Sequence, residues 1–126
     1  MESQLARKKA DGSNYRILVV DDSEDILQLL KAGLGRCGFD VVTASDGQDA
    51  MARSDSEIFD LVLTDICMPG INGNALARHI KYIKEEVPVI ALTGSVDLAG
   101  DHFDIVIKKP FRINFILNLI NDFIVR

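Results

Sequence analysis

Blocks of apolar and polar residues alternate along the chain with two different periods. Short, almost wholly apolar runs bounded by acids, glycine or proline are typical of buried strands in a parallel sheet. There are five such runs: Arg16–Val20, Val41–Ala44, Leu61–Thr64, Val89–Leu92 and Ile105–Ile107. Apolar residues at helical spacing predict helices over Ser23–Cys37, Gln48–Ser54, Asn74–Glu85 and Arg112–Val125. This alternation predicts an α/β fold, with a parallel sheet, right-handed crossovers and helices on both faces.

One connection is too short for the pattern. Only Thr93–Asp104 separates the fourth apolar run from the fifth, and Gly94 and Gly100 lie inside it. A helix in this segment has two turns at most, so we expect a fourth helix that is short or absent.

Composition narrows the class of protein. The length of 126 residues fits one domain, and the polar residues 1–14 predict a flexible tail ahead of a domain over 15–126. A net charge of −5 argues against nucleic acid or an anionic membrane as partner, and no apolar run approaches the ~18 residues of a membrane span. Cys37 and Cys67 have no metal-site spacing, which favours reduced thiols in a cytoplasmic protein.

Three acids follow directly on two of the predicted strands. Asp21 and Asp22 follow Val20, and Asp65 follows Thr64. In a parallel sheet the carboxyl ends of the strands point toward the binding crevice, so neighbouring strands would crowd these like charges together. Hard oxygen ligands of this kind suit Mg²⁺, and an aspartate can act as a nucleophile toward phosphorus. The plainer interpretation is capping of a helix or a loop, which explains each acid alone but not all three together.

Two further residues complete a possible phosphoryl site. Lys109 follows the fifth strand and precedes Pro110, where its compact positive charge could meet a phosphoryl oxygen. Thr93 follows the fourth strand and offers a hydroxyl beside the small Gly94. Their ordinary alternatives are a solvated lysine, as expected for Lys108, and a turn threonine.

These residues together resemble the receiver domain of two-component response regulators. The likeness covers Tyr15 to about Val125. Its matching motifs are, in order, Ile17–Ser23, Asp46–Ala50, Asp60–Gly70 with Gly73, Ala91–Gly94 and Lys109–Phe111. The resemblance implies a flavodoxin-like, doubly wound five-stranded sheet of order 2-1-3-4-5 with the site at the strand ends.

The resemblance also implies roles for the site residues. Asp65 would be the phospho-acceptor, and Asp21 and Asp22 would place Mg²⁺ with the help of Asp65 and the backbone carbonyl of Cys67. Thr93 and Lys109 would bind the phosphoryl group and convey its arrival.

The chain departs from the family pattern on the face that most receivers use for output. The family usually has an aromatic residue on the fifth strand three positions before the lysine, where this chain has Val106. Together with the short Thr93–Asp104 segment, this predicts an atypical switching surface.

The last predicted helix carries a second clue about partners. Phe115 and Leu119 lie off its apolar stripe, four residues apart, so they are neighbours on the helix surface. They either form an exposed face for a downstream protein or for self-association, or pack under the shortened segment.

The expected function is therefore signalling rather than metabolism. The chain would accept a phosphoryl group from a histidine kinase or a histidine phosphotransfer protein and then change its partner binding. It would be either a single-domain regulator or a receiver excised from a hybrid kinase. Two alternatives are a docking module that never takes phosphate and a small Mg²⁺-dependent aspartyl-phosphate phosphatase.

Overall fold

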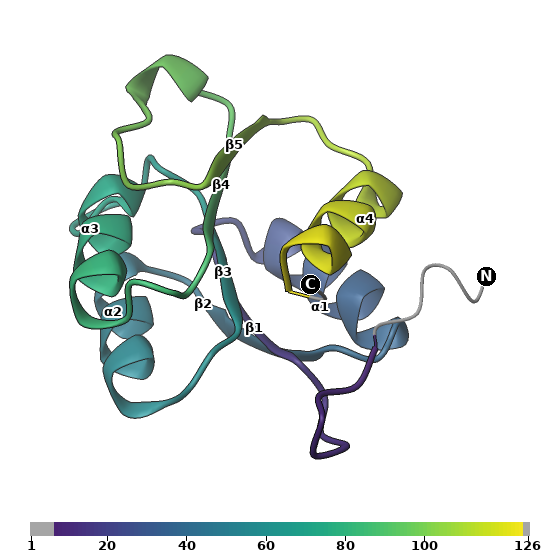
Figure 1. The fold of residues 1–126 in the computed structure, drawn as a ribbon. Helices are drawn as coiled ribbons and strands as arrows, with labels where there is room; N and C mark the ends of the chain where they lie inside the picture. The colour runs from purple at the N-terminus through teal and green to yellow at the C-terminus, as the bar shows by residue number, and fades with distance from the viewer. Residues whose placement is uncertain (1–6, 125–126) are drawn as a thin grey trace.

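A five-stranded parallel sheet forms the centre of the structure, a computed structural model that describes residues 7–124 (Figure 1). The strands are β1 (Arg16–Val20), β2 (Asp40–Ala44), β3 (Leu61–Thr64), β4 (Val89–Thr93) and β5 (Ile105–Lys108). The helices are α1 (Glu24–Arg36), α2 (Gly47–Ser56), α3 (Gly73–Ile83) and α4 (Ile113–Ile124), with a 3₁₀ turn, η2, at Val96–Leu98. The strand order β2-β1-β3-β4-β5 confirms the predicted flavodoxin-like fold.

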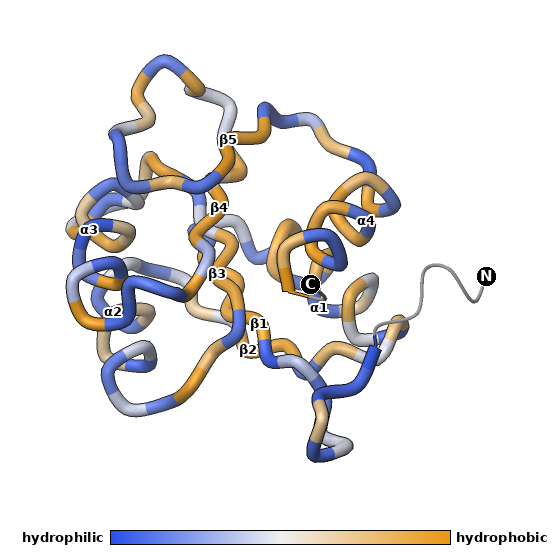
Figure 2. Tube along the Cα trace, viewed as in Figure 1, coloured by the Kyte–Doolittle hydropathy of each residue, from blue (hydrophilic) through white to orange (hydrophobic). Residues whose placement is uncertain are grey.

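Alternation along the strands divides the core into two layers. Ile17 and Val19 of β1 face a cluster that includes α1 and α4, whereas Leu18 and Val20 face a cluster with α2 and α3. The two helix pairs lie on opposite sides of the sheet (Figure 1), and the apolar strands run between them (Figure 2). A one-residue slip of β1 would exchange these two sets of side chains, so the register is strongly specified.

Polar caps determine where the helices begin. Ser23 caps α1, with its hydroxyl accepting from the backbone N–H of Ile26. The side chain of Asn72 accepts from the N–H of Ala75 and caps α3, which therefore begins at Gly73 and ends at Ile83 rather than spanning the predicted Asn74–Glu85. The last helix was predicted to reach Val125, which lies outside the described residues.

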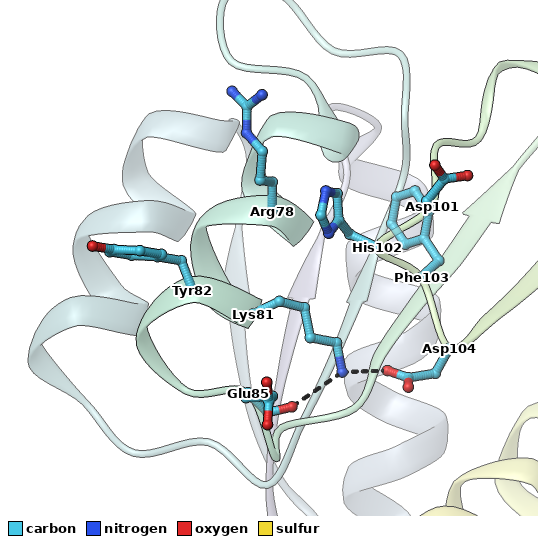
Figure 3. A pocket seen from close by; sticks show the side chains of 8 residues that line it. All are labelled: Arg78, Lys81, Tyr82, Glu85, Asp101, His102, Phe103 and Asp104. Carbon is cyan, nitrogen blue, oxygen red and sulfur yellow. Dashed lines mark hydrogen bonds and ion pairs between the residues drawn. The ribbon is translucent and has the colours of Figure 1, made fainter.

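The segment between β4 and β5 contains only the three residues of η2 as regular structure, which confirms the predicted shortening. Lys81 of α3 holds the end of this segment that leads into β5 (Figure 3). Its ammonium group donates to the carbonyl of Val87 at 2.8 Å and to the carboxylate of Asp104 at 2.7 Å. That carboxylate also accepts from the N–H of Val89, at 2.8 Å. The chain therefore enters β5 from a fixed point beside the start of β4.

Residues ahead of β1 contact the domain in the part that the structure describes. Lys8 and Asn14 form an isolated antiparallel bridge, and the ammonium group of Lys9 lies 3.0 Å from the carboxylate of Asp60. The division into a flexible tail over 1–14 and a domain over 15–126 stays a prediction. Among the described residues, no helix is both long enough and apolar enough to cross a membrane.

Gly47 provides a test of how closely α2 approaches the loop before α3. A Cβ at Gly47 would lie 2.2 Å from the carbonyl oxygen of Ile71, whereas one at Gly35 in α1 would meet nothing within 4 Å. We expect Gly47→Ala to lower the free energy of unfolding by about 2 kcal/mol through overpacking. The control, Gly35→Ala, should raise it by about 0.5 kcal/mol because alanine is the better helix former. Urea unfolding measures both, and equal stability of the two variants would contradict this close contact.

Candidate functional site

Acidic side chains from two neighbouring strand ends meet at one edge of the sheet. β1 and β3 pair in parallel with Val20 opposite Thr64, so Asp21 and Asp65 leave the sheet at the same level. Carboxylate oxygens of Asp21, Asp22 and Asp65 all lie within 4.8 Å of one another. Asp21 and Asp65 are buried, whereas Asp22 is exposed. The structure thus brings together the three acids singled out in the sequence.

Lys109, the residue after β5, joins the two buried acids. Its ammonium nitrogen lies 2.7 Å from Oδ2 of Asp21 and 3.1 Å from Oδ2 of Asp65. Lys108 is exposed, as expected from the sequence, and the peptide bond between Lys109 and Pro110 is cis. One positive charge therefore faces two negative charges in a largely buried place.

Burial and charge act against each other in this cluster. Burial raises the pKa of the Asp21 carboxyl group, although Lys109 and the N–H of Ser23 favour its ionised form. Burial also lowers the pKa of Lys109, but hydrogen bonds and charges from Asp21 and Asp65 outweigh it, so that this pKa lies above its ordinary value. Lys109 consequently stays protonated while the cluster as a whole retains negative charge.

Backbone groups orient the two buried carboxylates. Oδ1 of Asp65 accepts from the N–H of Ile66 at 2.6 Å, and Oδ1 of Asp21 accepts from the N–H of Ser23 at 2.9 Å. Each carboxylate thus has one oxygen on the backbone and the other on Lys109. Among residues 7–124, no cation forms an ion pair with Asp22. Unbalanced carboxylates this close together are the donor set that a hard cation such as Mg²⁺ requires.

Thr93 is the last residue of β4 rather than part of the following turn, and it is fully buried. Its Oγ1 accepts from the N–H of Ser95 at 3.0 Å, and its carbonyl accepts from the N–H of Lys109 at 2.8 Å. A Cβ at Gly94 would meet nothing within 4 Å, so the space beside Thr93 is open. Thr93 and Lys109 are thus backbone neighbours.

Two further residues considered in the sequence, Cys67 and Val106, are both exposed. Cys67 is exposed on the loop after β3, and its thiol is free, as is that of Cys37. Val106 lies on β5 opposite Ala91 and is 38% exposed.

Leu119 corrects part of the expectation for the last helix. Phe115 is 55% exposed, but Leu119 is half-buried against the core cluster of α1 and α4. The β4–β5 segment lies on the α3 side of the sheet (Figure 1), so Leu119 does not pack beneath it either. The prediction that both side chains form an exposed pair was wrong, because the core contacts a wider face of α4 than the apolar stripe indicated.

Comparison with known proteins identifies the family. A model of the response regulator receiver domain matches residues 17–121. The chain belongs to this family. Receivers are signalling domains of two-component systems, which agrees with the expected class of function.

Relatives and solved structures agree with this assignment. The alkaline phosphatase synthesis transcriptional regulatory protein PhoP of Bacillus subtilis is 37% identical over 78% of this chain and 43% of its own length. The response regulator ArlR of Staphylococcus aureus is 32% identical over 81% of this chain and 49% of its own. The chain thus spans less than half the length of these curated relatives.

Two solved structures have bound ligands that bear on the acidic cluster. TrrA from Thermotoga maritima, in complex with Mg²⁺-BeF, has a TM-score of 0.80 and 34% identity, covering 86% of this chain and 98% of that one. A chain of the CheX-CheY-BeF₃-Mg²⁺ complex from Borrelia burgdorferi has a TM-score of 0.82 and 26% identity, covering 91% of this chain and 93% of that one. The Asp21, Asp22 and Asp65 cluster fits a magnesium site of this kind.

Sequence reasoning named Gly73 only as part of a family motif and gave Asn74 no role. A Cβ at Gly73 would lie 2.1 Å from the carbonyl oxygen of Asp65, so α3 begins directly against the backbone of that acid. Asn74, the next residue, donates to and accepts from the β4–β5 segment. The Asn72-Gly73 pair, which reads as turn chemistry, was the available signal that the backbone approaches closely here.

Replacing Lys109 tests the charge balance of the cluster. In Lys109→Met, Asp21 and Asp65 keep their burial but lose their counter-charge. We expect the free energy of unfolding at pH 7 without Mg²⁺ to fall by about 2 kcal/mol. The control, Lys108→Met, changes an exposed lysine and should stay within about 0.5 kcal/mol of wild type.

The loss of stability in Lys109→Met should depend on pH. Because the pKa of Asp21 is raised in the folded state, the folded protein binds a proton more readily than the unfolded chain, and its stability rises as pH falls through that range. Without Lys109 the stability should rise more steeply as pH falls. The difference in free energy of unfolding between wild type and Lys109→Met should therefore shrink as pH is lowered toward 4. Urea unfolding across this range measures it, and a deficit independent of pH would contradict the assigned charge pairing.

Proposed function

We propose that the chain accepts a phosphoryl group on Asp65 from a phosphohistidine of a histidine kinase or phosphotransfer protein and thereby changes its partner binding. The observation that carries the proposal is the contact of one lysine, Lys109, with both Asp21 and Asp65 beside a third carboxylate. An arrangement that concentrates negative charge around a carboxylate needs positive charge to bring a phosphoryl group near it.

The transfer uses Asp65 as nucleophile. Oδ2 of Asp65 forms a bond to phosphorus while the bond between phosphorus and the histidine nitrogen breaks, and the electron pair stays on that nitrogen, which then takes up a proton. The N–H of Ile66 holds Oδ1 of Asp65 and so fixes the direction from which Oδ2 approaches. Lys109 and Thr93 hold the phosphoryl oxygens, one through charge and the other through its hydroxyl.

The donor set also fits a magnesium ion. Asp21, Asp22 and Asp65 would hold it with the backbone carbonyl of Cys67, and Asp22 is the acid without a cation among the described residues. When bound, the ion supplies positive charge that offsets the carboxylates and the phosphoryl oxygens. Since Lys109 already offsets one charge, we expect the ion to bind the remaining negative charge of the cluster.

The two alternatives find less support. An aspartyl-phosphate phosphatase needs a further acid to protonate its leaving group, whereas Asp21 is engaged by Lys109 and Ser23. A docking module that never takes phosphate has no need for a lysine held between two buried acids.

The downstream partner is a separate part of the proposal. The exposed Phe115 of α4 is the apolar side chain on that helix most open to a partner or to a second copy. A cytoplasmic location is favoured by the free thiols of Cys37 and Cys67.

Phosphorylation in vitro tests this function. The protein is mixed with Mg²⁺ and a small phosphodonor, and intact-mass spectrometry follows the adduct. We expect one phosphoryl group per chain in wild type and in the control Asp25→Asn, which changes an exposed acid in the first turn of α1. Asp65→Asn should carry none, because the amide is no longer a nucleophile.

The outcomes separate the three functions. A slowly hydrolysed adduct that requires Asp65 supports a receiver, and continuous release of phosphate from the donor would indicate a phosphatase. Absence of any adduct in wild type would overturn the proposal in favour of a docking module.

A further inference from the structure

The side chain of Asn74, near the start of α3, both donates a hydrogen bond to the β4–β5 segment and accepts one from it. Its Nδ2 donates to the carbonyl of Leu98 at 2.9 Å, and its Oδ1 accepts from the N–H of Gly100 at 2.7 Å. Gly100 fits closely, because a Cβ there would lie 3.1 Å from Oδ1 of Asn74. One amide group thus satisfies two backbone groups that lie 24 and 26 residues away in the chain.

These contacts continue as an unbroken chain of hydrogen bonds to Thr93. The N–H of Leu98 donates to the carbonyl of Ser95 at 3.0 Å, which closes the single turn of η2. The N–H of Ser95 in turn donates to Oγ1 of Thr93 at 3.0 Å. A hydroxyl that accepts from Ser95 has its own proton directed elsewhere, and so remains able to donate.

The other end of the connection lies at Asp65. Gly73 precedes Asn74, and its N–H donates to the carbonyl of Ile66 at 2.8 Å. Since Gly73 also lies directly against the backbone of Asp65, α3 is positioned by the same loop that carries the acid. Asn74 therefore joins the element that touches Asp65 to the segment that orients Thr93.

The residues of η2 bury little of their own surface near the site. Val96, Asp97 and Leu98 are all exposed, and η2 has a single turn. The second anchor on α3, Lys81 with Asp104, lies at the far end of the segment beside β5 (Figure 3). The placement of Ser95 consequently depends on Asn74 more than on Lys81.

We propose that Asn74 is a positioning residue for phosphoryl binding, which acts by fixing η2 and, through Ser95, the hydroxyl of Thr93. The proposal rests on the function proposed above. Because coupling free energies are reciprocal, a phosphoryl group held by Thr93 also changes how firmly α3 and η2 are joined. The switching surface of this chain is then the junction of α3 with the β4–β5 segment, a route that needs no aromatic side chain at Val106.

A double-mutant cycle tests the coupling, with beryllofluoride in the presence of Mg²⁺ as the phosphoryl probe. We expect Asn74→Ala to weaken beryllofluoride binding by about three- to tenfold, the size of one or two hydrogen bonds. The affinity for Mg²⁺ alone should stay within about twofold. In a Thr93→Val background the same Asn74→Ala change should have less than about a twofold effect, because the hydroxyl that Asn74 positions is gone.

Lys81→Met is the matched control, since it removes the other side-chain anchor of the same segment from the same helix. It should lower stability in urea unfolding but leave beryllofluoride affinity within about twofold. An Asn74→Ala affinity equal to wild type would overturn the proposal. So would an equal loss in the Thr93→Val background, or a parallel loss of Mg²⁺ affinity.

A measurement on the wild-type protein guards against loss of folding in the variants. In amide nuclear magnetic resonance spectra, the resonances of Ser95 and Gly100 should both move when Mg²⁺ and beryllofluoride are added. A Gly100 resonance that stays in place while Ser95 moves would overturn the role of Asn74. If wild type binds no beryllofluoride at Asp65, the proposed function itself fails, and this result is distinct from a silent Asn74→Ala.

Discussion

The contact of the Lys109 ammonium group with Asp21 and Asp65 is the interaction on which the rest of the site depends. It joins residues that follow three different strands, β1, β3 and β5, at one edge of the sheet. Without it, two buried carboxylates would face each other unpaired, an arrangement far more costly than the loss of an exposed ion pair. The sheet order and the strand registers therefore have to be right before the site can exist, because a shift of one residue turns each of these side chains to the other side.

Most of the fold and much of the site follow from local pattern. Buried parallel strands are short and apolar throughout, so their ends are easily recognised, and the acids of the site follow directly on β1 and β3. Asp21, Asp65 and Lys109 could therefore be expected at one edge of the sheet once the family resemblance supplied the order of the strands. Element ends were less certain: Thr93 proved to belong to β4, and α3 begins one residue before its predicted start because Asn72 supplies the cap.

Asn74 and Leu119 show what local pattern does not contain. The partners of Asn74 are backbone groups far away in the sequence, and a polar residue in the first turn of a helix gives no local sign of them. For Leu119 the helical period gave its direction on α4, but not how far the neighbouring helix α1 and the sheet curve around it. Both depend on where a second element lies, which is a property of the assembled chain.

Lys108 and Lys109, two successive residues at the end of β5, have different roles. β5 is an outer strand of the sheet. It pairs with β4 on one side, and no strand within residues 7–124 pairs with its other side. Unpaired strand edges invite association with other chains, and proteins commonly blunt them with brevity, charge and proline. Here the edge has four residues, ends in the exposed Lys108 and is closed by Pro110, which has no N–H to offer. While Lys109 turns inward to the acids, Lys108 makes the same strand a poor template for aggregation.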